Sequence, residues 1–304
     1  MYYTIKARQH QDIFRHFSPN IEELAYIIDM KKIFRGVCTA LVTPFKKDKI
    51  DWKAFGRLIE FQIANGVDAL LVLGTTGESP TISDEERKAL VTFAMDVVAK
   101  RVPVIVGIGG NNPTTIIKYG TWAKEAGADM VMVTAPYYNK TTQEGAVKFF
   151  DTIAKNLRMP IMVYNIPGRV GMNMQPETLA RIAKNKYIQA IKESSGNIEQ
   201  IQAVVRLCPK TAVYTGDDTI SLPCYAVGCI GIVSVASNSK PKEVGEIFSL
   251  FARNKIKKAR DQYFLHLPFF TSLFTSVNPI PIKQELSRMG LCCNELRLPL
   301  VNQG

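Results

Sequence analysis

The sequence predicts an α/β fold, specifically a (β/α)8 barrel. Short, β-branched apolar runs recur along the chain, a polar turn follows each run, and a segment of helical period follows each turn. Runs that are apolar on both faces are typical of a parallel sheet covered by helical crossovers. Eight such units follow one another in roughly 215 residues, and eight is the number that closes a barrel of this type.

Each predicted strand is a short aliphatic run bounded by turn residues. In chain order the strands are Gly36–Thr43, Val67–Leu73, Pro103–Ile108, Met130–Ala135, Pro160–Asn165, Ile188–Lys192, Ala212–Thr215 and Ile230–Val235. The structural alternative is an open doubly wound sheet. No GxGxxG sequence follows the first strand, so the dinucleotide fingerprint of many such sheets is missing.

Helical candidates alternate with these strands. They are Trp52–Asn65, Asp84–Ala99, Thr114–Ala126, Gln143–Asn156, Pro176–Lys184, Ile198–Leu207, Thr219–Val227 and Lys242–Phe251. Several carry start signals: Ser83 precedes three acidic residues, and Pro113 and Pro176 stand at first-turn positions. The alternation of strand and helix is therefore supported at the helix boundaries as well as by the apolar pattern.

The chain is expected to have three parts. Residues 1–29 are atypical in composition and are predicted to be a non-essential extension. They lack the small-residue cleavage site of a signal peptide. Residues 30–253 are expected to form the catalytic barrel. Residues 254–304 are expected to form a C-terminal helical region, which Asn278-Pro279-Ile280-Pro281 interrupts.

Composition excludes several classes of protein. No apolar run approaches the roughly 18 residues that a membrane span needs, so we expect a soluble protein without a membrane partner. The six cysteines show neither paired metal-ligand spacing nor the density of a disulfide scaffold, which favours a reducing cytoplasm.

Charge and histidine content narrow the function further. The net charge of +11 is scattered among acidic residues and forms no long basic run, so nucleic-acid binding is not expected. Such a surface can attract small anionic substrates. Beyond residues 1–29 the only histidine is His266, so Ser-His-Asp and Cys-His catalysis and histidine-rich zinc sites are poorly supported.

Lys192 is the strongest single candidate for chemistry. It ends the apolar run Tyr187–Ile191, and a polar turn follows it at once. In a barrel of this type the catalytic residues lie at the carboxyl ends of the strands. A lysine amine in a desolvated pocket can attack a carbonyl and form a Schiff base. The alternative is an ordinary lysine that extends from a strand end to solvent.

Other strand ends supply groups that such a lysine would need. Gly74-Thr75-Thr76-Gly77 offers hydroxyls and backbone N–H groups to a carboxylate, although an ordinary glycine-rich turn is the alternative. Tyrosines and an arginine follow two further strands, where packing and solvation are the alternatives. The remaining candidates at strand ends are Tyr137, Tyr138, Tyr164, Arg169, Gly216 and Val233.

Taken together, these segments resemble the pyruvate-dependent class I aldolases, and within them the dihydrodipicolinate synthase family. The resemblance runs from about Phe34 to Leu300. The matching segments are Thr39–Phe45, Gly74–Ser79, Ala135–Lys140, Tyr164–Arg169, Ile191–Glu193, Gly216–Asp218 and Asn278–Pro281.

The resemblance implies a role for each candidate residue. The Schiff-base lysine corresponds to Lys192, and a proton relay corresponds to Thr75, Tyr164 and Tyr138. Tyr138 is expected to reach into the active site of a neighbouring subunit. A tyrosine hydroxyl suits a relay because it is protonated at neutral pH and can pass a proton through a hydrogen-bonded partner.

Substrate binding is assigned to four further positions. Thr76 would hold the carboxylate of pyruvate, and Arg169 would hold the carboxylate of the second substrate, a task that suits a planar bidentate donor. Gly216 and Val233, at the ends of the seventh and eighth strands, are further substrate-binding candidates.

The resemblance implies a lyase that condenses pyruvate with L-aspartate 4-semialdehyde in the diaminopimelate route to lysine. It implies no metal, flavin or nicotinamide, and a homo-oligomer assembled as a dimer of dimers. The alternatives are N-acetylneuraminate lyase and the 2-keto-3-deoxy sugar-acid aldolases, which share the pyruvate-lysine chemistry. The paired Thr75-Thr76, the Tyr137-Tyr138 pair and Arg169 favour the synthase over these enzymes.

The sequence departs from lysine-inhibited relatives in one loop. Those enzymes place an acidic residue a few positions after the asparagine of the third βα loop, where it binds the amino groups of the inhibitor. Here Asn111 is followed by Asn112, Pro113, Thr114 and Thr115. A hydroxyl does not compensate a buried cationic amine as a carboxylate does. We therefore expect insensitivity to feedback inhibition by lysine.

Overall fold

A computed structural model describes residues 34–302 of the chain. The extension predicted at residues 1–29 lies outside the described residues. The described residues form one compact unit, so the barrel and the C-terminal helical region pack together. Within residues 34–302, no helix is long and apolar enough to cross a membrane.

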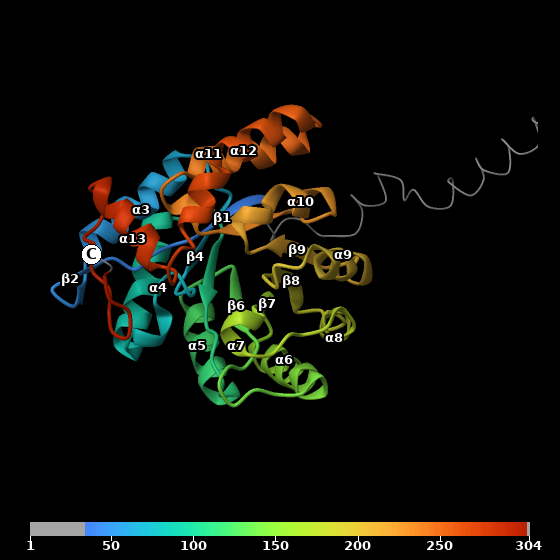
Figure 1. Cartoon of the computed structure of the whole chain (residues 1–304). Helices are drawn as coiled ribbons and strands as arrows, with labels where there is room; N and C mark the ends of the chain where they lie inside the picture. The colour runs from blue at the N-terminus through green and yellow to red at the C-terminus, as the bar shows by residue number, and fades with distance from the viewer. Residues whose placement is uncertain (1–33, 303–304) are drawn as a thin grey trace, which may run out of the picture. The chain divides into compact units, whose positions relative to one another are not determined.

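Eight parallel strands close into a barrel in the order β1-β10-β9-β8-β7-β6-β5-β4, which confirms the predicted fold class. Figure 1 shows these strands at the centre with helices around them. Their bounds are β1 Gly36–Ala40, β4 Ala69–Val72, β5 Val104–Gly107, β6 Met130–Thr134, β7 Ile161–Asn165, β8 Ile188–Glu193, β9 Ala212–Thr215 and β10 Gly231–Ser234. Each predicted strand overlaps one of these.

The helices follow the strands as the apolar pattern predicts. Those of the barrel are α3 Trp52–Ala64, α4 Asp84–Val98, α5 Pro113–Glu125, α6 Gln143–Leu157, α8 Pro176–Ile182, α9 Ile198–Leu207, α10 Ser221–Ala226 and α11 Pro241–Ala252. At the start of α4, Ser83 and Glu86 form a reciprocal capping box, in which each side chain binds the backbone N–H of the other residue. The C-terminal helices are α12 Ile256–Ser272 and α13 Ile280–Arg288.

Four local features differ from the sequence prediction. The first strand ends at Ala40. The Leu41 N–H still donates to the Leu71 carbonyl of β4, but the Val42 N–H donates to the Asn238 side chain instead of to a strand. A two-stranded hairpin, β2 Phe45–Lys46 with β3 Lys49–Ile50, follows.

The other two differences follow the fifth and seventh strands. The short helix α7, Pro167–Val170, was not predicted. The predicted helix Thr219–Val227 is divided into a 3-10 turn, Asp218–Ile220, and α10, because Pro223 has no N–H to donate to the Thr219 carbonyl, which accepts from the Tyr263 hydroxyl instead.

Apolar side chains fill both sides of the barrel wall. Alternate residues of a strand face opposite sides, so on β8 Ile191 packs in the layer between strands and helices, while Ala190 and Lys192 face the interior. The interior-facing residues nearest the carboxyl ends therefore converge on one mouth, where barrels of this type have their catalytic residues.

Candidate active site

Lys192 lies at the carboxyl end of β8 and is buried, with 5% of its surface exposed. It pairs in register with Tyr164 on β7, so both side chains face the same side of the sheet. The Lys192 Nζ lies 4.1 Å from the centroid of the Tyr164 ring, and Tyr164 is itself buried. The structure thus excludes the alternative of a solvated surface lysine, and it brings two of the predicted catalytic residues together.

Gly216 leaves the space that the Lys192 side chain occupies. A Cβ atom at this position would lie 2.4 Å from the Lys192 Cε and 2.0 Å from the Ser194 Oγ. Val233 is fully buried on β10, where it pairs with Cys38 of β1. Burial raises the pKa of the Cys38 thiol, and the charge of Lys192 opposes this rise.

The turn after β4 has the properties of a carboxylate site. The Gly77 N–H donates to the Gly74 carbonyl at 3.1 Å, and the Glu78 N–H donates to the Thr75 carbonyl at 3.0 Å. In the part of the chain that the structure describes, the N–H groups of Thr75 and Thr76 donate to no protein acceptor. Two adjacent free donors in a mostly buried turn can bind an anionic oxygen.

Thr76 and Arg169 share a neighbour in the C-terminal region. Asn278 Nδ2 donates to Thr76 Oγ1 at 3.0 Å, and the Asn278 carbonyl accepts from Arg169 Nη2 at 3.2 Å. Thr76 is buried, whereas Arg169, on α7, remains exposed. Asn278 therefore links the two groups that were predicted to bind the substrate carboxylates.

A cavity of about 350 Å³ opens beside this turn. Thr75, Arg87, Thr115 and Arg169 are among the residues that line it. Lys192, Tyr164, Gly216 and Val233 are not among its lining residues. The cavity therefore lies beside the turn and does not contain the Schiff-base candidate.

Tyr138 is separate from the other candidates within a single chain. Its side chain is 91% exposed, and its backbone φ of 64° lies in the left-handed region that non-glycine residues seldom adopt. Its neighbour Tyr137 lines the cavity. The structure of one chain thus does not bring Tyr138 to Lys192.

The sequence prediction missed a buried polar layer behind the strand ends. Asn165 Nδ2 donates to both carboxylate oxygens of Glu193, at 3.2 and 2.9 Å, and the Ser195 N–H donates to Glu193 at 2.8 Å. Burial raises the pKa of Glu193, and these hydrogen bonds oppose the rise. Both residues lie within quoted segments, Tyr164–Arg169 and Ile191–Glu193, and that position was their only signal in the sequence.

Within the described range, 34–302, no three or more Cys, His, Asp or Glu side chains form a group that could hold a metal ion. The functional groups that the strand ends do bring together are amine, phenol, hydroxyl and backbone N–H. These suit carbonyl chemistry on a substrate that carries a carboxylate.

Comparisons with known proteins agree with this geometry. The model of the dihydrodipicolinate synthetase family matches residues 33–303. A 4-hydroxy-tetrahydrodipicolinate synthase of Hydrogenobaculum sp. (strain Y04AAS1) is 45% identical over 266 residues, which cover 87% of this chain and 92% of that protein.

Solved structures give the same result. The dihydrodipicolinate synthase of Thermotoga maritima has a TM-score of 0.88 and 42% identity, and the match covers 90% of this chain and 94% of that one. The enzyme of Cyanidioschyzon merolae, whose structure has lysine bound, has a TM-score of 0.87 and 37% identity, covering 89% of this chain and 93% of that one. Because the family model covers most of the sequence and the curated relative exceeds 40% identity, the chain belongs to the dihydrodipicolinate synthetase family.

Proposed function

We propose that the chain is a 4-hydroxy-tetrahydrodipicolinate synthase, which condenses pyruvate with L-aspartate 4-semialdehyde in the diaminopimelate route to lysine. The observation that carries the proposal is the buried Lys192 amine, 4.1 Å from the Tyr164 ring at the carboxyl end of the barrel. A buried lysine at this position is suited to carbonyl addition, and the free N–H groups of the Thr75-Thr76 turn are suited to a keto-acid carboxylate.

In the proposed reaction, Lys192 Nζ adds to the ketone carbon of pyruvate and water leaves, which forms an iminium. The iminium withdraws electrons, so a methyl proton is lost and an enamine forms. The enamine carbon then bonds to the aldehyde carbon of the second substrate. The amino group of that substrate finally attacks the iminium carbon, which closes the ring and releases Lys192. This sequence consumes no oxidant and no reductant.

The other residues have proposed roles in the same steps. Tyr164 would donate and accept protons, with Thr75 linking it to Tyr138 of a neighbouring subunit. The exposure and left-handed backbone of Tyr138 support a role outside its own chain. A strained backbone conformation needs surrounding contacts to maintain it, and the exposed side chain of Tyr138 has few within its own chain. This exchange of Tyr138 requires an assembly of at least two subunits. The family resemblance implies a dimer of dimers.

Substrate binding is proposed for Thr76, Arg169, Gly216 and Val233. The link through Asn278 supports the roles of Thr76 and Arg169, because it places both near one segment of backbone. Gly216 would keep the approach to the lysine open, as a Cβ there would overlap the Lys192 side chain. Val233 would contribute an apolar wall.

Borohydride trapping tests the proposal. Incubation with pyruvate and reductant should add a pyruvyl group to Lys192, identified by peptide mass spectrometry. Coupled turnover of pyruvate with L-aspartate 4-semialdehyde should exceed turnover with sialic acid. Higher efficiency with a sugar acid would favour the alternative lyases, and absence of the adduct would reject Schiff-base chemistry. Sedimentation of the active enzyme tests the tetramer.

A further inference from the structure

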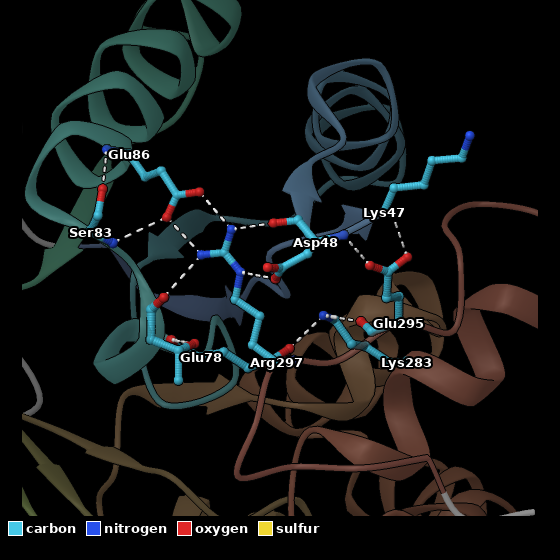
Figure 2. Close-up of polar contacts among 9 residues, drawn as sticks. Lys47, Asp48, Glu78, Ser83, Glu86, Lys283, Glu295 and Arg297 are labelled. Atoms are coloured by element: carbon cyan, nitrogen blue, oxygen red, sulfur yellow. Dashed lines mark hydrogen bonds and ion pairs between the residues drawn. The ribbon is translucent and has the colours of Figure 1, made fainter.

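We propose that the buried ion pair between Lys283 and Glu78 is a positioning device for pyruvate, through which the C-terminal region holds the turn Gly74–Glu78. The inference rests on the proposed function, and it assigns a substrate-positioning role to the C-terminal helical region. In Figure 2, Glu78, Lys283 and Arg297 lie together, and they come from segments far apart in the sequence.

Both members of the pair are withdrawn from solvent. The side chains of Lys283 and Glu78 are 0% and 1% exposed, and Lys283 Nζ donates to Glu78 Oε1. The same ammonium donates to the Glu295 carbonyl at 2.7 Å and lies 4.1 Å from the centroid of the Phe45 ring. Burial lowers the pKa of Lys283, and the charge of Glu78 opposes this change. The ammonium therefore depends on Glu78 for compensation of its charge.

Glu78 needs this anchor because of its backbone conformation. Its φ is 53°, in the left-handed region, and it is the last residue of the turn whose Thr75 and Thr76 N–H groups are free. A non-glycine residue adopts this conformation at a cost, and the surrounding structure must maintain it. Lys283 holds one carboxylate oxygen, and the Arg297 N–H donates to the other at 3.0 Å.

The C-terminal region holds the same turn at a second point, where Asn278 donates to Thr76. Asn278 directly precedes Pro279, the N-cap of α13, and Lys283 lies in the first turn of that helix, so the start of α13 contacts both the middle and the end of the turn. The link from Asn278 to Arg169 extends the contact to the second proposed carboxylate site.

Stability alone is a weak explanation for such a pair. A well-packed apolar replacement of a buried ion pair is often as stable as the pair or more stable, because desolvation of two charges offsets their attraction. Small displacements of binding groups, by contrast, reduce rates strongly. The buried Lys283–Glu78 pair is therefore better explained by a role in fixing the position of the free Thr75 and Thr76 N–H groups than by a role in stability.

Lys283→Met tests the inference. With intact folding, the KM for pyruvate should rise about tenfold or more, while the KM for L-aspartate 4-semialdehyde should change by less than about threefold. Lys155→Met is the matched control, since Lys155 pairs with Asp151 on α6 and is 70% exposed. Its kinetic constants should remain those of the wild type. Kinetics are measured well below the lowest melting temperature of the series.

The double variant Glu78→Gln/Lys283→Met separates positioning from stability. It removes the uncompensated carboxylate and keeps an acceptor for the Arg297 N–H, so the melting temperature should recover toward that of the wild type. The KM for pyruvate should nevertheless remain raised, because the Lys283 anchor is absent. If Lys283→Met does not fold, the KM for pyruvate of the double variant is compared with that of the wild type instead.

Two results would overturn the inference: a wild-type KM for pyruvate in the folded single variant, or full return of KM together with melting temperature in the double variant. The wild-type enzyme is trapped with pyruvate and borohydride in parallel. Failure of that trapping rejects the proposed function and this inference with it, whereas normal trapping with unchanged variants rejects this inference alone.

Discussion

The surroundings of the Lys192 amine and the turn Gly74–Glu78 are held in place in different ways. Lys192 and Tyr164 lie on adjacent strands, and their 28-residue separation spans one βα unit, so sheet register alone brings them together. The turn at Thr75–Glu78 depends on Asn278 and Lys283, which follow it by 202 and 205 positions. One half of the site is thus determined by the barrel, and the other half requires the C-terminal region.

The largest effect should come from the barrel-built half. Lys192→Ala removes the only proposed nucleophile, so turnover should fall by about 10⁴-fold or more, and pyruvate trapping should be lost. Lys186→Ala, an exposed lysine that precedes the same strand, is the control and should leave turnover unchanged. The measurement is coupled turnover together with peptide mass spectrometry. Residual turnover within tenfold of wild type would show that Lys192 is not the Schiff-base residue.

A smaller effect is expected at Arg169, which belongs to the turn-side half. Arg169→Lys keeps the charge and removes the planar bidentate donor, so the KM for L-aspartate 4-semialdehyde should rise by about 10- to 100-fold. Half-saturation by pyruvate in the trapping assay should change little. A substitution that raised only the pyruvate value would assign Arg169 to the other carboxylate.

The contrast also explains what the sequence could predict. The eight strands and the strand-end position of Lys192 were predictable because apolar runs and polar turns are local signals, and because register then places neighbouring strand ends together. Assignment of Gly216 as a site position came from resemblance. Its steric reason, the overlap of a Cβ with Lys192, became visible only in three dimensions.

The contacts that hold the turn, from Asn278 and Lys283, were not predictable in the same way. Glu78 and Lys283 are isolated charges in the sequence, and no periodicity relates two residues 205 positions apart. Asn278 was noted only as part of the segment Asn278–Pro281, which interrupts helices and matches the family, and neither observation related it to Thr76. The split before α10 was missed because the apolar period alone does not show that Pro223 lacks the N–H needed to bond the Thr219 carbonyl.

A third prediction concerns Arg297 of the C-terminal region and its ion pairs with Glu86 and Asp48. Arg297 Nη1 and Nη2 each donate to a carboxylate oxygen of Glu86 at 2.6 Å, and Nε donates to Asp48 at 3.1 Å (Figure 2). Arg297→Met should lower the free energy of unfolding by about 2 kcal/mol at neutral pH, measured by urea titration. The matched control is Arg101→Met, which breaks a bidentate pair with Glu60 at an exposed site and should cost less than about 1 kcal/mol.

The pH dependence of this variant follows from Glu86. Hydrogen bonds from Arg297 hold the pKa of Glu86 below its usual value of 4.5, so the pair contributes stability above about pH 4.5 and loses it as the pH falls through the folded-state pKa. The difference between wild type and Arg297→Met should therefore be largest near neutrality and decrease in acid. A difference that grew on acidification would contradict the role assigned to this pair.

The smallest effect should be the response to L-lysine, because the cavity beside the turn does not suit a cation. None of its lining residues, all within the described range, is acidic. The buried guanidinium of Arg87 lies in its wall, donates to the Ser79 carbonyl at 2.9 Å and stacks 4.3 Å from the Tyr119 ring centroid. An ammonium placed here would meet a cation and the Thr115 hydroxyl without a compensating carboxylate.

We therefore expect turnover to be unchanged by millimolar L-lysine and no binding heat in calorimetry. Thr115→Glu sharpens the test, because it introduces the missing carboxylate into the cavity wall without altering Thr75. Weak inhibition that appears only in this variant would show that a ligand in the cavity can act on the adjacent turn. That turn is the part of the site that depends on the C-terminal region as well as on the barrel. Strong inhibition of the wild type at sub-millimolar L-lysine would instead mean that a buried guanidinium and a threonine hydroxyl suffice to accept a dibasic ligand.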